Sequence, residues 1–248
     1  MKRYIILFLV LFFSLTIMIN GEELTPNSNS SILIESSTGK ILYEKNSNEK
    51  MAPASMTKIM TLLLIMEKLE EKSILLDDEV YISSHAASMG GSQIFLPANG
   101  HVKLEDLLKG IAIASGNDAA TAMAEYIGGT EENFVSMMNE KVKELGLKNT
   151  NFKNPHGLDE ANHYTTAYDL SMISKELLKH DEVIKYTSIY EEEYLTINGE
   201  KRWLVNTNSL MTAKEYLRLI SRMETFLESK RERLSAVREL GWRFRCCS

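Results

Sequence analysis

The chain has 248 residues, of which 44% are hydrophobic and 25% charged, and its formal net charge is −6. A body of this length can bury one sizeable core, and a negative net charge argues against nucleic acid or an anionic surface as a partner. The only two cysteines, Cys246 and Cys247, are adjacent and near the last residue, so we expect no disulfide in the body.

The first 21 residues are typical of a secretory signal peptide. Lys2 and Arg3 precede an apolar run over residues 4–19, and Gly21 supplies a small residue at the expected cleavage point. The alternative is an uncleaved membrane anchor, but the run is shorter than the ~20 residues that a spanning helix needs. No other membrane anchor is evident. Either way, we expect the working part to be exported to the cell envelope, outside the cytoplasm.

After a polar leader over residues 22–31, the pattern predicts strands, then helices, then strands again. The expected elements in chain order are strands at 32–35 and 41–43, a helix at 55–72, an extended segment at 77–84, helices at 104–114, 118–126, 131–145 and 166–180, and strands at 186–198 and 201–205. Asn198-Gly199 is a strong signal for a hairpin turn between the last two strands. This order predicts a mixed α/β (α+β) fold whose sheet is closed from both ends of the chain.

A Ser-x-x-Lys motif, Ser55 to Lys58, opens the long apolar helix. Residues i and i+3 share a helix face, so Lys58 can lie beside the Ser55 hydroxyl. Burial lowers the pKa of a lysine, so Lys58 can act as the neutral base that a serine nucleophile needs. Two other matches, 37–40 and 47–50, fall in a turn and a polar loop. The structural alternative for Ser55 and Lys58 is an N-cap serine with a solvated lysine.

A second motif, Ser115-Gly116-Asn117, follows an apolar helix sixty residues later. The glycine break allows both polar side chains to project into a cleft, where Ser115 can relay a proton and Asn117 can hold a substrate amide. The structural alternative is a helix-terminating Ser-Gly, with Asn117 or Asp118 capping the next helix. Together, the two motifs form the front half of a penicillin-type acyl-transfer site.

With these motifs the chain resembles the serine D-alanyl-D-alanine carboxypeptidases, the low-molecular-mass penicillin-binding proteins. Further matches to the family lie at 38–39, 42–46, 51–55, 91–92, 154–158, 166–170 and 206–208, and the resemblance runs from about Ile32 to Met211. It implies a serine β-lactamase/DD-peptidase-like fold, in which an antiparallel sheet built from both chain ends carries an inserted helical subdomain.

The resemblance also implies a reaction and its residues. Ser55 would attack the carbonyl of the penultimate D-alanine in a peptidoglycan stem peptide ending in D-Ala-D-Ala. Lys58 would be the base, Ser115 the proton shuttle and Asn117 a substrate ligand. β-Lactams would acylate Ser55 as covalent inhibitors. No metal and no organic cofactor is implied.

The family's third motif, a Lys-Thr-Gly strand, does not occur after Asn206. The choice of basic residue also changes. Residues 212–248 hold seven arginines and two lysines, whereas residues 1–211 hold two arginines and 17 lysines. We interpret residues 32–211 as an incomplete catalytic domain and 212–248 as an atypical Arg-rich helical tail produced by a frame change or truncation. A natural basic tail is the alternative. The hypothesis predicts that the C-terminal sheet strands are missing and that activity is impaired.

Two other functions stay open from the sequence. A class A β-lactamase shares Ser-x-x-Lys but needs a glutamate base after the second motif. The best-placed acids, Asp159 and Glu160, follow a segment that resembles the carboxypeptidases. A non-catalytic wall-binding protein, or a defective remnant of a penicillin-binding protein, would explain the missing strand.

Overall fold

A computed structural model describes residues 24–195 and 201–208 of the chain. Its elements in chain order are β1 (Ser31–Ile34), β2 (Ile41–Lys45), the 3-10 helix η1 (Ala54–Thr57), α2 (Lys58–Glu70), β3 (Glu79–Tyr81), α3 (Ser84–Ala87), β4 (His101–Lys103), α4 (Leu104–Ala114), α5 (Asn117–Gly128), α6 (Glu131–Glu144), α7 (Ala167–Leu177), α8 (Glu182–Thr187), β5 (Glu191–Leu195) and β6 (Lys201–Val205). The order of strands, helices and strands confirms the predicted mixed fold class.

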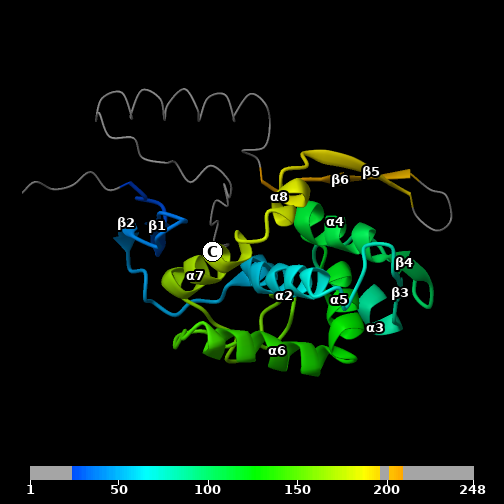
Figure 1. The fold of residues 1–248 in the computed structure, drawn as a ribbon, viewed down its shortest axis with the longest axis horizontal. Coiled ribbons are helices and arrows are strands. Elements are labelled where there is room, and N and C mark those ends of the chain that lie inside the picture. The colour runs from blue at the N-terminus through cyan, green and yellow to red at the C-terminus, as the bar shows by residue number, and fades with distance from the viewer. Residues whose placement is uncertain (1–23, 196–200, 209–248) are drawn as a thin grey trace, which may run out of the picture.

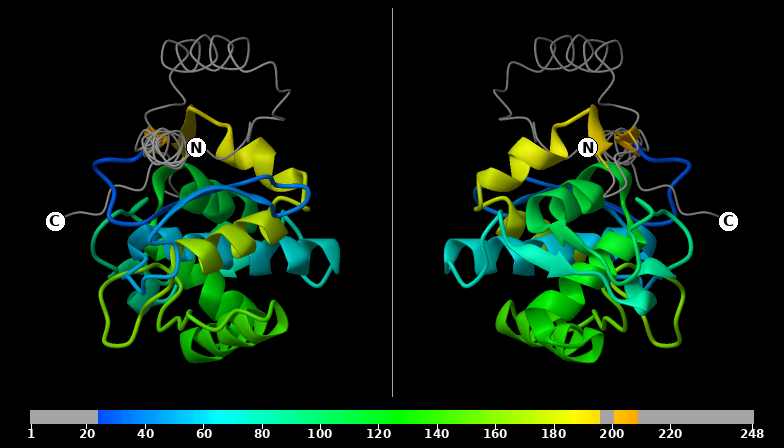
Figure 2. Two further views of the ribbon diagram at one scale, coloured as in Figure 1. Left: turned by 90° about the vertical axis from the view of Figure 1, so that its left-hand side faces the viewer. Right: turned by 90° about the vertical axis from the view of Figure 1, so that its right-hand side faces the viewer.

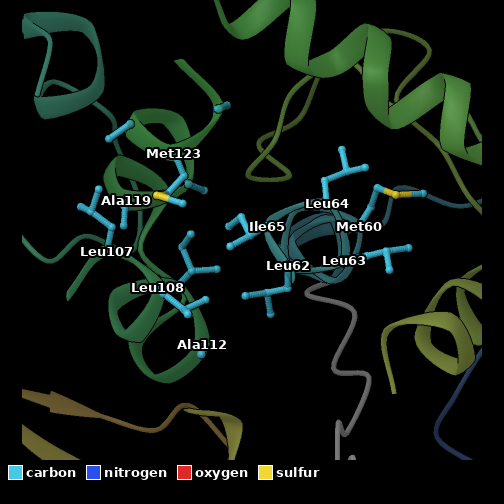
Figure 3. Packing of buried hydrophobic residues seen from close by; sticks show 14 of the residues in the cluster. Met60, Leu62, Leu63, Leu64, Ile65, Leu107, Leu108, Ala112, Ala119 and Met123 are labelled. Atoms are coloured by element: carbon cyan, nitrogen blue, oxygen red, sulfur yellow. The ribbon is translucent and has the colours of Figure 1, made fainter. Parts of the chain in front are cut away.

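Helix α2 lies at the centre of the fold. It contacts α7 on one side and α4 and α5 on the other, with α6 packed below (Figure 1). Figure 3 looks along α2 and shows its apolar side chains projecting to all sides, with Leu62 and Ile65 toward Leu108 and Met123 on the neighbouring helices. A helix that is apolar all round must be buried, which confirms the interpretation of this segment as a core helix. Each fully buried leucine or isoleucine contributes about 1.5–3 kcal/mol.

Helices α6 and α7 begin at polar caps that the sequence supplies. Thr130 accepts a hydrogen bond from Asn133 N at 3.2 Å at the start of α6, and Thr166 accepts one from Asp169 N at 3.0 Å at the start of α7. Such caps satisfy main-chain N–H groups that have no partner within the helix. They fix where α6 and α7 begin, so the predicted helix starts at 131 and 166 are correct to within one residue.

The strands differ from the prediction in how they pair. They form three separate antiparallel pairs, β1–β2, β3–β4 and β5–β6. The hairpins from the two ends of the described chain lie on different parts of the helical body (Figure 1), and Figure 2 shows α6 and the β5–β6 hairpin on opposite faces of that body. Among residues 24–195 and 201–208, no hydrogen-bonded ladder joins β1–β2 to β5–β6, so the expected single sheet is not closed there.

Several local elements differ from the prediction. The strand expected from residue 186 begins only at Glu191, because Glu182–Thr187 is helix α8. Val183 and Tyr186, three residues apart, are both buried, and α8 contacts α4 and α2. The short helix α3 and the strand β4 were also missed; β4 pairs with β3 over only three residues each, a length too short to show the alternation of a strand.

Several predictions lie outside the described residues. These are the signal peptide over 1–21, the Asn198-Gly199 turn and the Arg-rich tail over 212–248. In the part of the chain that the structure describes, no helix has the length and apolar character needed to cross a membrane.

Candidate active site

Ser55 lies on η1, the single 3-10 turn that leads into α2. The serine is exposed, whereas Thr57 and Lys58, which follow it, are buried. Thr57 Oγ1 is 2.8 Å from His163 Nε2. Since His163 Nδ1 accepts a hydrogen bond from Lys153 N at 3.0 Å, Nε2 carries the proton and donates to Thr57. The exposed hydroxyl of Ser55 therefore lies on a turn that the buried hydrogen bond between Thr57 and His163 holds in place.

Lys58 is the centre of the site. Only 2% of the residue is exposed, and its Nζ lies 3.4 Å from Ser55 Oγ, 2.6 Å from Asn117 Oδ1 and 2.8 Å from the main-chain oxygen of His156. Burial lowers the pKa of Lys58 from 10.5 to about 7, and the negative charge of Asp118 opposes this shift. A substantial fraction of Lys58 is thus a neutral amine near pH 7, as the sequence predicted.

Asn117 is the first residue of α5 and points back to Lys58. Its main-chain N–H donates to Ser92 O at 2.7 Å, and its side-chain Nδ2 donates to Gly90 O at 2.8 Å. Asp118 Oδ1 accepts a hydrogen bond from the first-turn N–H of Ala119 at 2.9 Å. Gly116, the N-cap residue of α5, makes no side-chain cap bond, and the Asn117 side chain does not cap the helix. The structure instead brings Ser55, Lys58 and Asn117 together from two segments that are about sixty residues apart.

Ser115 ends helix α4 in the left-handed conformation, with φ of +56°. This conformation is uncommon for a residue with a side chain, and it turns the chain sharply between α4 and α5. Ser115 is buried, and its Oγ has no hydrogen-bond partner within the described part of the chain. No hydrogen bond links it to Ser55 or Lys58 there, so its role as a proton shuttle stays a prediction.

The turn over residues 154–158 supplies a contact that sequence reasoning did not identify. Asn154 Oδ1 accepts from Gly157 N at 2.7 Å and its Nδ2 donates to Leu158 O at 2.9 Å. This turn presents the His156 carbonyl to Lys58. Gly157 has φ of +94°, and a Cβ there would lie 1.8 Å from Ala54 O, so only glycine allows the turn to pack this closely against η1.

The imidazole of His156 is neutral at physiological pH. Burial, with a further contribution from the charge of Lys58, lowers its pKa from 6.5 to about 4. Its Nδ1 accepts from Leu158 N at 3.1 Å, and its Nε2 lies 3.8 Å from Glu131. Because the ring is uncharged, this approach to Glu131 is a weak polar contact rather than an ion pair. Lys58 is therefore the titratable group of the site that changes charge near pH 7.

An open hollow lies between η1 and the 157–163 segment, lined by Ala52, Ala54, Gly157, Asp159, Glu160, Ala161 and His163. Among residues 24–195 and 201–208, no group of three or more His, Cys, Asp or Glu side chains could hold a metal ion. The chemistry that these residues can perform is nucleophilic attack by Ser55 with Lys58 as its base.

Comparison with known proteins identifies the family of the chain. The sequence profile of peptidase S11, the D-alanyl-D-alanine carboxypeptidases, matches residues 19–220. D-alanyl-D-alanine carboxypeptidase DacF of Bacillus subtilis is 60% identical over 190 residues, which are 76% of this chain and 49% of that protein. DacC of Escherichia coli is 40% identical over 173 residues, covering 67% of this chain and 43% of DacC.

Solved structures agree with the fold. Penicillin binding protein 5 from Haemophilus influenzae superposes with a TM-score of 0.70 at 36% identity, covering 75% of this chain and 54% of that one. The described strands are few, but their arrangement with the helices is that of the DD-peptidase fold. The chain spans about half the length of the curated relatives it matches. On these findings, the chain belongs to the D-alanyl-D-alanine carboxypeptidase family.

Proposed function

We propose that the protein is a serine-type D-alanyl-D-alanine carboxypeptidase of the bacterial cell envelope, which removes the terminal D-alanine from peptidoglycan stem peptides through an acyl-enzyme on Ser55. The observation that carries the proposal is the geometry of Lys58: a buried amine with a pKa of about 7 lies 3.4 Å from an exposed serine hydroxyl. The names of its relatives supply the substrate class.

The contacts of Lys58 explain how it acts as a base. A neutral amine has two N–H bonds and one lone pair. Asn117 Oδ1 at 2.6 Å and His156 O at 2.8 Å accept the two N–H bonds. The lone pair is then directed to the third neighbour, Ser55 Oγ, and can accept its proton. A general base so placed contributes a factor of about 10²–10⁴ in rate.

The proposed reaction has the following chemical steps. Ser55 Oγ loses its proton to Lys58 and bonds to the carbonyl carbon of the penultimate D-alanine. The tetrahedral intermediate collapses as the C–N bond breaks, and the leaving amine takes a proton, delivered through Ser115. Water then attacks the ester, and the proton that Lys58 removes from it returns to Ser55. One water is consumed and one D-alanine is released.

Asn117 has two roles in this proposal. Its oxygen orients Lys58, and one N–H of its Nδ2 binds Gly90 O. The second N–H of the amide binds the substrate carbonyl on the acyl side. A β-lactam presents a ring-strained amide in the place of the peptide amide and is opened by the same attack of Ser55, so β-lactams are expected to acylate the protein. The proposal places the protein outside the cytoplasm, exported by its N-terminal segment.

The absence of Lys-Thr-Gly from residues 206–248 leads to a second proposal, about turnover. That strand carries a carboxylate ligand and an oxyanion donor in the family, and removal of one oxyanion donor costs about 10²–10³ in rate. We infer that the 248-residue polypeptide hydrolyses D-Ala-D-Ala peptides far more slowly than its relatives. A non-catalytic wall-binding role is the outcome if no acylation occurs at all.

Intact-mass measurement of the protein from its own host, with and without penicillin, tests both proposals. One penicillin adduct that Ser55→Ala abolishes supports the acyl-enzyme. A mass corresponding to residues 22–248 with no adduct would refute it for this polypeptide and favour a binding role. Rapid turnover of nitrocefin, in place of a stable adduct, would identify a β-lactamase.

A further inference from the structure

We propose that Asp118 is a positioning residue for this site: its buried carboxylate anchors the segment 90–96, and that segment orients the Asn117 amide that binds Lys58. The inference deepens the proposed function, because it rests on Lys58 as the base. It assigns a task to a buried acid that the reaction steps themselves do not use.

Asp118 is fully buried, yet it has no ion-pair partner within 4.0 Å in the part of the chain that the structure describes. Its carboxylate accepts hydrogen bonds from main-chain N–H groups instead. Ile94 N lies 3.1 Å from both oxygens, Leu96 N donates at 3.2 Å and Ala119 N at 2.9 Å. Burying an acid without a cation is expensive unless it is hydrogen-bonded, so these bonds tie the segment firmly to the start of α5.

The anchored segment binds both the main chain and the side chain of Asn117. Ser92 O accepts from the Asn117 main-chain N–H at 2.7 Å, and Gly90 O accepts from its Nδ2 at 2.8 Å. With Nδ2 held, Oδ1 is directed to Lys58 Nζ at 2.6 Å. Gly91 packs so closely against the Asn117 amide that a side chain does not fit there, since a Cβ on Gly91 would lie 2.8 Å from Asn117 Nδ2. The connection from Asp118 to Lys58 is therefore a short series of direct contacts.

The charge of Asp118 acts on Lys58 as well. Burial lowers the pKa of Lys58, and Asp118 is the charged group that raises it in opposition. The other titratable group that faces Lys58 is His156, which is neutral, with Glu131 behind it. Removal of the Asp118 charge should therefore lower the pKa of Lys58 further. This titration therefore reports the charge of Asp118, whereas the Asn117 amide signals report its anchoring of the segment 90–96.

The experiment is NMR of the full chain with ¹³Cε-labelled lysine and ¹⁵N-labelled asparagine. The Lys58 and Asn117 signals are assigned by their loss in Lys58→Arg and Asn117→Ser. In Asp118→Asn we expect the Lys58 titration midpoint to fall below its wild-type value of about 7 and the Asn117 side-chain amide signals to move. The matched control is Asp169→Asn, because Asp169 is also buried and accepts from a main-chain N–H, that of Asn149 at 2.9 Å. It should change neither signal.

A second variant separates position from charge and serves if Asp118→Asn does not fold. Gly91→Ala keeps Asp118 but places a methyl group against Asn117. We expect the Asn117 amide signals to move and penicillin labelling of Ser55 to slow by about 10²-fold, the typical effect of misplacing a catalytic group by 1 Å. Gly129→Ala is the control, since Gly129 has a similar φ of +75° and nothing within 4 Å of an added Cβ.

The outcomes decide the proposal whether or not the protein turns over substrate. Unmoved Asn117 amide signals in Asp118→Asn, or equal changes in Asp169→Asn, would overturn it. Unmoved Asn117 signals in Gly91→Ala would overturn the route through the segment. If the wild-type protein is not labelled by penicillin, the proposed function fails, while the two NMR signals still test the role of Asp118.

Discussion

Replacing Gly157 by alanine tests how closely the 154–158 turn must pack against the nucleophile. A Cβ at this position would lie 1.8 Å from Ala54 O, 2.4 Å from the carbon of the same carbonyl and 2.9 Å from Thr57 Oγ1. The nearest atoms belong to the main chain and cannot rotate away. The turn must therefore retreat from η1, and the carbonyl of His156, the preceding residue, moves away from Lys58 with it.

The size of the effect follows from two costs. A residue with a side chain loses about 1–2 kcal/mol in the left-handed region that Gly157 occupies, and inserting a methyl group into a packed contact costs about 1–3 kcal/mol. Gly157→Ala should thus lower the free energy of unfolding by about 2–5 kcal/mol, where each 1 kcal/mol corresponds to about 2–4 °C in Tm for a chain of this size. Gly146→Ala is the control. Gly146 has φ of +71° but nothing within 4 Å of an added Cβ, so this variant should lose only about 1–2 kcal/mol, the cost of the left-handed conformation.

Urea unfolding followed by circular dichroism measures both variants, and fluorescent-penicillin labelling of Ser55 reports on the site. We expect Gly157→Ala to be clearly less stable than Gly146→Ala and to be labelled more slowly. Equal losses of stability in the two variants would refute the reasoning, because they would mean that the contact with Ala54 contributes nothing beyond the backbone conformation.

Three further predictions concern the helix that carries the base. The labelling rate should rise with pH through about 7 as Lys58 becomes neutral, and Lys58→Arg should reduce it by about 10²–10⁴, since arginine cannot supply a neutral base; a flat pH profile would contradict this. The folded state holds the pKa of Lys58 below its ordinary 10.5, so the unfolded state binds more protons and the free energy of unfolding should rise between pH 7 and 10.5 by up to about 1.4 kcal/mol per pH unit. In Lys58→Met this contribution should disappear from the pH dependence measured by urea unfolding, and an unchanged slope would argue that Lys58 is solvated. Thr61→Val, which removes the 2.6 Å hydrogen bond to the buried Pro155 carbonyl, should cost about 1–3 kcal/mol in the same assay, and a neutral effect would show that water replaces the hydroxyl.

The sequence was most informative where residue type and spacing carry the chemistry. Ser55 and Lys58 are three residues apart, on the 3-10 turn η1 and at the start of α2, so their proximity follows from helical geometry. Asn117 could be assigned because Ser-Gly-Asn interrupts an apolar helix. The long helices were predicted for a similar reason, since α2 has no Gly or Pro and α6 begins at a Thr cap.

The rest of the site depends on main-chain groups, which have no sequence signature. Lys58 binds the carbonyl of His156, and Asn117 binds those of Gly90 and Ser92; any residue could present the same oxygen. The signals that could have pointed to them are indirect: an Asn-Pro-His-Gly turn and a Gly-Gly pair. An acid at a helix start is usually a capping residue, and Asp118 does accept from Ala119 N, but its further hydrogen bonds from Ile94 N and Leu96 N are visible only in the fold.

The three contacts of Lys58 are made by residues three, 59 and 98 positions away in the chain. Two of them exist only after long loops have closed, which is a late and slow event in folding. Before that point Lys58 is an ordinary solvated ammonium and Ser55 an ordinary alcohol. An unfolded copy of this chain is therefore chemically inert, and reactivity toward acyl donors arises only when the fold is complete.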